Sequence, residues 1–152
     1  MVVINSPNGA PPASRKASMS RENYVDLANF RLALRRFLAF SDVAVGAVGI
    51  TSQQYQALLA IKASAEEALA VKDLAEQMLL APNGAVQLID RLEAQKLVAR
   101  RELQADRRVV MVSLTEQGEA TLEQLAIDHI AELVRQKRLL AESLRRLKAI
   151  GK

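Results

Sequence analysis

The segment from Leu69 to Glu119 restricts the possible folds of this chain most strongly. Apolar residues at steps of three and four predict two short helices in series, over 71–79 and 82–95. The strands predicted over 98–103 and 109–114 then form a hairpin, whose tip begins at Gln104. A helix presented beside a basic β-ribbon is typical of proteins that grip duplex DNA, with the helix in the major groove and the ribbon at the backbone or minor groove.

Helices are also predicted on both sides of this segment. Ser20 can cap a first helix that runs to about Val45, and the capping-box residues Thr51 and Gln54 open a second helix over 52–63. Residues 65–70 are interpreted as a connector. The residues expected to form a buried stripe on the first helix are Tyr24, Leu27, Phe30, Arg31, Leu34, Phe37, Leu38 and Ser41. In the two central helices the residues expected inward are Leu74, Ala75, Met78, Ala85, Val86, Leu88, Ile89 and Leu92.

The last helix opens at Thr115 and keeps one apolar register as far as Leu147, which predicts one helix of about 30–35 residues or two nearly collinear pieces. A helix of that length cannot bury its whole apolar stripe inside so small a domain. We therefore expect its surplus, together with the first helix, to form a dimer interface.

The chain has 152 residues and is expected to form one domain. Residues 1–19, rich in Pro, Asn, Ser and Gly, are expected to be a disordered tail, and residues 20–152 the domain. Within the domain we predict a DNA-binding core over 50–118 and dimerisation helices over 20–48 and 119–150. Half of the residues are hydrophobic but only 3% are aromatic, so the core must rest on aliphatic side chains, which suit helices.

Several kinds of chemistry are disfavoured by the composition. The chain has no cysteine and one histidine, His129, so we expect no disulfide, no metal site and no cofactor. His129 is interpreted as a packed or interface residue. Neither a Ser-His-Asp order nor a glycine-rich phosphate loop is found, which argues against an enzyme. The sequence has no apolar run of about 18 residues and no signal peptide, so a cytoplasmic protein without a membrane segment is expected.

The helix over 82–95 carries a second, polar face. Asn83, Gln87 and Arg91 are spaced four residues apart and therefore share one side. Asn and Gln can bond bidentately to adenine, and Arg to guanine or phosphate. Gly84 would let the helix backbone approach DNA closely. The alternative interpretation is an ordinary solvated helix face.

The hairpin tip is expected to carry Asp106, Arg107 and Arg108. Arginine at a ribbon tip fits the negative potential of a narrow minor groove. Asp106 opposes DNA binding by its charge, and we interpret it as orienting Arg108 through a charge-assisted hydrogen bond. The formal net charge of +4 adds modest support for a nucleic-acid partner.

The stretch from Leu74 to Gly118 resembles the winged-helix core of MarR-type transcriptional regulators. The resemblance rests on Asp-Arg-Leu-Glu at 90–93, Leu97-Val98 with Arg100, Asp-x-Arg at 106–108, and Leu114-Thr115 with Gly118. It extends to most of the chain, because ITSQQYQALLAI resembles the second helix of that family. The resemblance implies a mainly α fold with a small β-hairpin wing, in which Asp106 and Arg100 support the wing.

The same resemblance implies a homodimer that binds palindromic promoter DNA, usually as a repressor, often released by a small phenolic or carboxylate effector. No residue set identifies the effector site. A cleft between the first, second and last helices could hold a small acid. Tyr55 and Arg31 are candidate contributors, although a structural role is the favoured interpretation of each. A winged-helix module that binds protein instead of DNA is the alternative. The missing polar caps and the apolar Val86 on the helix over 82–95 allow this alternative, but the wing arginines argue against it.

Three departures from the family pattern affect geometry. Lys96 stands where glycine is usual, and costs about 1 kcal/mol if the backbone there is left-handed. Ala70 and Ala81 stand where Ser or Thr caps are common, which forfeits about 1 kcal/mol each. The region after Gly118 is shorter than usual, so the loop between the last two helices is expected to be missing.

Overall fold

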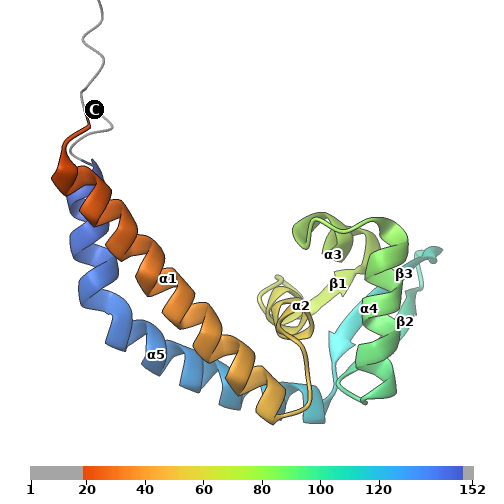
Figure 1. The fold of residues 1–152 in the computed structure, drawn as a ribbon. Helices are drawn as coiled ribbons and strands as arrows, with labels where there is room; N and C mark the ends of the chain where they lie inside the picture. The colour runs from red at the N-terminus through yellow and green to blue at the C-terminus, as the bar shows by residue number, and fades with distance from the viewer. Residues whose placement is uncertain (1–18, 149–152) are drawn as a thin grey trace, which may run out of the picture.

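The computed structural model describes residues 19–148, and the tail predicted over 1–19 lies almost entirely outside them. The described chain is mainly helical, with one small sheet (Figure 1). Its elements, in order, are α1 (Arg21–Ala47), α2 (Ser52–Lys62), β1 (Ala68–Ala70), α3 (Val71–Gln77), α4 (Pro82–Ala94), β2 (Val98–Leu103), β3 (Asp106–Leu114) and α5 (Glu116–Lys148). The predicted class, mainly α with a hairpin wing and terminal helices, is confirmed.

The first two helices begin at capping boxes. The Ser20 side chain accepts from the Asn23 amide, while the Asn23 side chain accepts from the Ser20 amide. Thr51 and Gln54 are paired in the same reciprocal way, at 3.2 Å and 2.8 Å. Each box satisfies two amides that a helix start leaves without intrahelical partners. The predicted starts of α1 and α2 are therefore confirmed.

The sheet has three antiparallel strands in the order β1-β3-β2. The connector predicted over 65–70 is wrong at its end, because Ala68–Ala70 pairs with Met111–Ser113 as β1. The tip is also shorter than predicted. β3 begins at Asp106, which pairs with Leu103, and only Gln104 and Ala105 form the turn. Asp106, Arg107 and Arg108 therefore lie on a strand next to the tip.

An aliphatic core lies between the sheet and helices α2, α3 and α4. Its largest fully buried side chains include Leu58, Ile61, Leu74, Ile89, Leu92 and Val112. The start of α5 is held against this core at Gly118, where an added Cβ would lie 2.0 Å from the Leu97 carbonyl oxygen. Glycine is therefore required there by close backbone packing.

Helices α1 and α5 run side by side as an arm that extends from the core (Figure 1). α5 is one continuous helix of 33 residues, so the separating loop is indeed missing. Between the two helices, the rings of Phe37 and Phe40 pack T-shaped against His129. The buried small and polar residues of these helices are Asp26, Ala33, Ser41, His129, Glu132 and Ser143.

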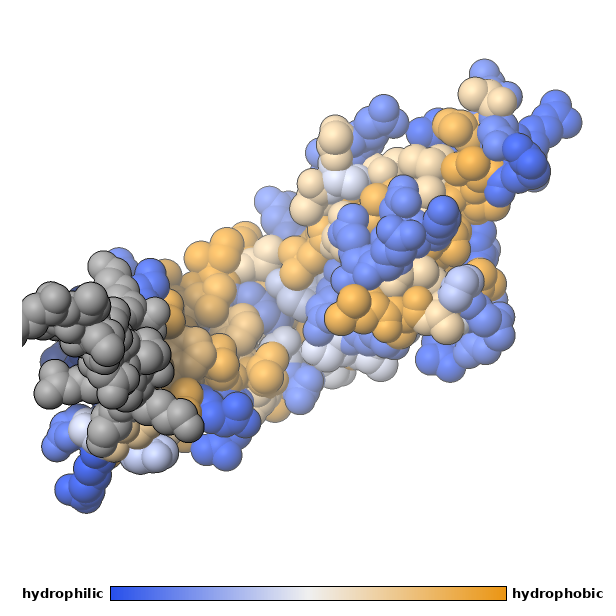
Figure 2. All heavy atoms as spheres, turned by 90° about the horizontal axis from the view of Figure 1, so that it is seen from above, coloured by the Kyte–Doolittle hydropathy of each residue, from blue (hydrophilic) through white to orange (hydrophobic). Residues whose placement is uncertain are grey.

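The apolar stripe predicted to be buried on α1 is largely exposed in the single chain. Exposed apolar residues of the arm are Tyr24, Val25, Leu27, Leu34, Leu38, Val43, Ile127, Ile130, Leu133, Val134 and Leu144. Figure 2 shows such side chains gathered along the arm. The predicted stripe is thus buried only in part in one chain. Ser41 is buried and Phe30 and Phe37 are half-buried, whereas the other five predicted residues are exposed.

Two of the predicted departures are visible in the backbone. Lys96 has a φ of 60°, in the left-handed region that favours glycine. Ala70 and Ala81, at the N-caps of α3 and α4, make no side-chain capping bond. Within residues 19–148, no helix is long and apolar enough to cross a membrane.

Candidate nucleic-acid interface

The predicted polar row lies on one exposed side of α4. Asn83, Gln87 and Arg91 are all exposed, whereas Ala85, Leu88, Ile89 and Leu92 are buried on the opposite side. Val86, predicted to be buried, is 39% exposed. It lies between the two faces, three residues after Asn83. The helix therefore offers amide and guanidinium groups to a partner, with one apolar side chain beside them.

At the N-terminal end of α4, Gly84 leaves the helix backbone without a side chain. Pro82 occupies the first turn, and a Cβ added at Gly84 would meet only Leu80 Cβ, at 3.8 Å. That distance is an ordinary contact, so packing within the chain does not require glycine at position 84. Leu79, in the turn before α4, has a φ of 54° and is 93% exposed.

Asp106 and Arg108 are paired on β3. The Asp106 carboxylate accepts from the Arg108 backbone amide at 3.0 Å and from Nε and Nη2 of its guanidinium at 3.1 Å each. The guanidinium and then the amide lower the pKa of the Asp106 carboxyl. The Arg108 side chain nevertheless stays 90% exposed. The neighbouring Arg107 is exposed as well.

Arg100 links the wing, which comprises β2 and β3, to α4. From β2 its guanidinium donates to the Asp90 carboxylate, to Glu93 at 3.0 Å and to the Val86 carbonyl oxygen at 3.4 Å. Sequence reasoning assigned Arg100 to wing support but did not find these partners. The signal was present, because Asp90 and Glu93 are three residues apart on one helix and can converge on a single cation.

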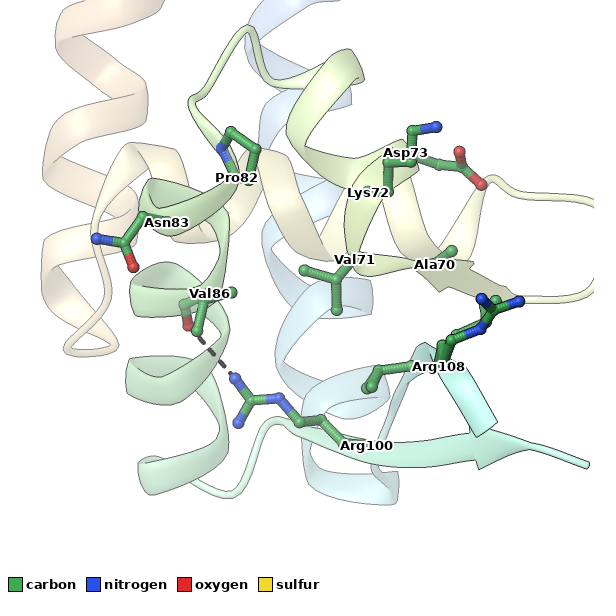
Figure 3. Close-up of a pocket in the computed structure, with 11 residues that line it drawn as sticks. Ala70, Val71, Lys72, Asp73, Pro82, Asn83, Val86, Arg100 and Arg108 are labelled. Atoms are coloured by element: carbon green, nitrogen blue, oxygen red, sulfur yellow. Dashed lines mark hydrogen bonds between the residues drawn. The ribbon is translucent and has the colours of Figure 1, made fainter. Parts of the chain in front are cut away.

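A groove of about 800 Å³ lies between α4, the wing and α3. Figure 3 shows Arg100 reaching across it toward Val86, while Asn83 points away from it. Lys72, which sequence reasoning did not single out, lies at its edge. The lining residues are Ala70, Val71, Lys72, Asp73, Pro82, Asn83, Val86, Arg100, Arg108, Val109 and Val110.

Hydrogen bonds fix the C-terminal end of α4 on two sides. Gln95, the C-cap, donates from Nε2 to the Gly49 carbonyl oxygen at 2.9 Å and accepts from Gln54 Nε2 at 2.8 Å. On the other side, Thr115 Oγ1 donates to the Lys96 carbonyl oxygen at 2.6 Å. These contacts join segments far apart in sequence, and no local motif indicated them.

A second cavity, of about 350 Å³, lies between α1, α2 and α5. His129 is buried at its wall, stacked on Tyr55 at 4.4 Å between ring centroids, and its Nε2 lies 2.8 Å from Ser41 Oγ. The interpretation of His129 as a packed residue is confirmed. Burial raises the pKa of Tyr55. Tyr55 lines the cavity as expected, but Arg31 is not among its lining residues.

The helix α4 beside a basic two-stranded wing defines a winged-helix protein. The model of the MarR family matches residues 48–109. The organic hydroperoxide resistance transcriptional regulator of Bacillus subtilis is 34% identical over 102 residues, which cover 67% of each chain. The repressor MdtR of the same organism is 33% identical over 94 residues, 62% of this chain and 59% of the relative.

Solved structures share the fold. AbsC, a MarR family transcriptional regulator from Streptomyces coelicolor, superposes with a TM-score of 0.69 at 23% identity, over 87% of this chain and 90% of AbsC. An E. coli MarR mutant complexed with operator DNA gives 0.63 at 22% identity, over 88% and 96%. The chain belongs to the MarR family, and the relatives that it matches are transcriptional regulators.

Proposed function

We propose that this chain binds specific duplex DNA through α4 and the wing, and thereby regulates transcription in the cytoplasm, as a repressor. The observation that carries the proposal is the exposed row Asn83, Gln87 and Arg91, beside a wing that presents Arg107 and Arg108. Amide side chains can read base edges in the major groove, and arginines next to the hairpin turn can reach the flanking minor groove. A relative with the word repressor in its name, MdtR, supports this direction of regulation.

Titration of random-sequence duplexes across salt concentrations tests DNA binding. Log affinity should fall steeply with log salt, because phosphate contacts release counterions. Arg108→Ala should weaken binding to all sequences and lower the salt slope by about one per copy, whereas Gln87→Ala should change base preference. Arg145→Ala, an exposed arginine near the end of α5, is the matched control. A flat salt response would favour the alternative, a protein-binding module.

We propose further that the arm forms a homodimer. Many large apolar side chains of α1 and α5 are exposed in the single chain. A second copy would remove this apolar surface from water, which is the main driving force for association. Two α4 helices about 34 Å apart would then fit a palindromic site. Leu27→Glu should shift sedimentation toward the monomer, whereas Gln53→Glu on α2 should not.

The cavity beside His129 suits a small aromatic effector. The residues that line it in the described chain include Phe37, Tyr55 and Leu133 but no lysine or arginine, so its chemistry favours a neutral ring over a carboxylate. The matched probes 2-naphthol and 2-naphthoate test this choice. Release of bound DNA by the naphthol alone is expected; release by the naphthoate alone would contradict the proposed class.

A further inference from the structure

The C-terminal end of α4 is where both arm helices meet the DNA-facing part of the molecule (Figure 1). Gln95 binds the Gly49 carbonyl oxygen in the turn that follows α1, and Thr115, which precedes α5, binds the Lys96 carbonyl oxygen. We call this set of contacts the junction. Any change in the angle between the arm and α4 must deform it.

Gln54 gives the Gln95 contact more weight than an exposed pair would have. Gln54 is only 5% exposed, and its amide oxygen is already used by the Thr51 amide. Its amide nitrogen donates to Gln95 Oε1 at 2.8 Å. Loss of that acceptor would leave a buried donor without its partner, which costs more than an ordinary hydrogen bond contributes.

The same turn of α2 also forms part of the wall of the cavity beside His129. Ser52 and Tyr55 line that cavity, and Gln54 lies between them in sequence with its side chain directed to the end of α4. One helical turn therefore touches the cavity on one side and the junction on the other. Close-packed interiors transmit displacement, so a change on one side acts on the other.

We propose that Gln95 is a positioning residue that sets the angle of α4 and carries the state of the cavity to it through Gln54. This inference rests on the proposed DNA-binding function. Gln95 itself lies twelve residues from Asn83, about 18 Å along the helix. It therefore acts on base contacts only by the tilt of α4, which affects sequence selectivity more than phosphate binding.

The test compares two duplexes: one selected by the wild-type protein from a randomised pool, and a scrambled duplex of equal length. Gln95→Met keeps the side-chain length and removes both hydrogen bonds. We expect affinity for the selected duplex to fall about tenfold and that for the scrambled duplex to change less than about twofold. Gln53→Met, the same change at an exposed position of α2, should leave both unchanged.

Failure of the inference is distinguishable from failure of the proposed function. A wild-type protein that selects no duplex contradicts the function, whereas an unchanged selectivity ratio in Gln95→Met overturns the role of Gln95. If Gln95→Met loses helix content, Gln95→Glu decides. This variant keeps an acceptor for Gln54 and loses the donor to Gly49. We therefore expect its affinity for the selected duplex to fall about threefold, and an unchanged affinity would overturn the proposal.

Transmission from the cavity is tested without an effector. Ala126→Phe places a ring at the cavity wall on α5, away from the junction. We expect it to change the affinity for the selected duplex at least threefold when Gln95 is present. In the Gln95→Met background, the change in log affinity should be less than half as large. An effect that is absent, or equal in both backgrounds, overturns the transmission.

Discussion

The carboxylate of Asp106 holds Arg108 by both its backbone amide and its guanidinium, over distances of 3.0 to 3.1 Å. Asp106 thus holds the backbone and the guanidinium of a residue whose side chain stays 90% exposed. The pair restricts the rotamers of Arg108 before any partner binds. A preorganised side chain loses less entropy on binding than a free one.

Asp106→Asn separates orientation from charge. If charge alone mattered, removal of a carboxylate would tighten DNA binding. We expect it to weaken binding about threefold instead, because asparagine lacks the charge and the second acceptor oxygen that hold the Arg108 guanidinium. Glu102→Gln, the same change at an exposed position of β2, should tighten binding slightly. Fluorescence anisotropy with one duplex at fixed salt measures both, and tighter binding by Asp106→Asn would refute the orienting role.

The pH dependence of this pair follows from the lowered pKa of Asp106, which is due to the Arg108 side chain and then its amide. A carboxylate with a lowered folded pKa keeps its contribution above the unfolded pKa and loses it as pH falls through the folded pKa. That loss lies in acid, below about pH 4. The affinity ratio of wild type to Asp106→Asn should therefore stay constant between about pH 5 and 8. A ratio that varies in this range would contradict the assignment.

Arg100→Met should affect both stability and binding. The Arg100 side chain is 25% exposed and neutralises Asp90 and Glu93 on α4, so its loss leaves two carboxylates beside the helix face that we propose to contact DNA. We expect the free energy of unfolding to fall by about 1 kcal/mol and DNA affinity to fall for all sequences. Arg101→Met, at an exposed neighbour on β2, removes the same charge without this link. Equal losses of stability and DNA affinity in the two variants would argue against a role for the link between Arg100 and α4.

Local signals were sufficient to predict most of the helices. Thr51 with Gln54 and Pro82 after Ala81 mark helix starts by chemistry that acts within one turn. β1 was missed because three residues, two of them alanine, form a strand only by pairing with Met111–Ser113. The exposed stripe of α1 was misplaced for a similar reason, since periodicity defines a face but not what covers it.

In the candidate site, too, local features could be predicted from the sequence and contacts between distant elements could not. The spacing of Asn83, Gln87 and Arg91 fixed their common face, because helix periodicity is local. The partners of Arg100 and the contacts of Gln95 join different elements, and Gln95 lies 46 residues from Gly49 in sequence. Such contacts depend on how elements pack, which no single stretch of sequence specifies.

Lys96 offers a stability prediction at the turn after α4. Its φ of 60° strains a side chain with a Cβ, so Lys96→Gly should raise the free energy of unfolding by about 0.5–1 kcal/mol. The reverse change is Gly49→Ala. Gly49 has a φ of 77° and nothing within 4 Å of an added Cβ, so only backbone strain acts and about 1 kcal/mol should be lost. Urea unfolding at one protein concentration measures both.

Gly84→Ala should move stability and DNA binding in opposite directions. The added Cβ meets Leu80 Cβ at 3.8 Å, so the fold accepts it, and alanine in a helix is more stable than glycine by about 0.5–1 kcal/mol. If the backbone of α4 approaches DNA at this point, the methyl group should weaken binding to a selected duplex at least threefold. Gly46→Ala, in α1 with nothing within 4 Å, should stabilise the protein without changing binding. A Gly84→Ala protein that is more stable and binds as tightly as wild type would show that α4 meets DNA through side chains alone.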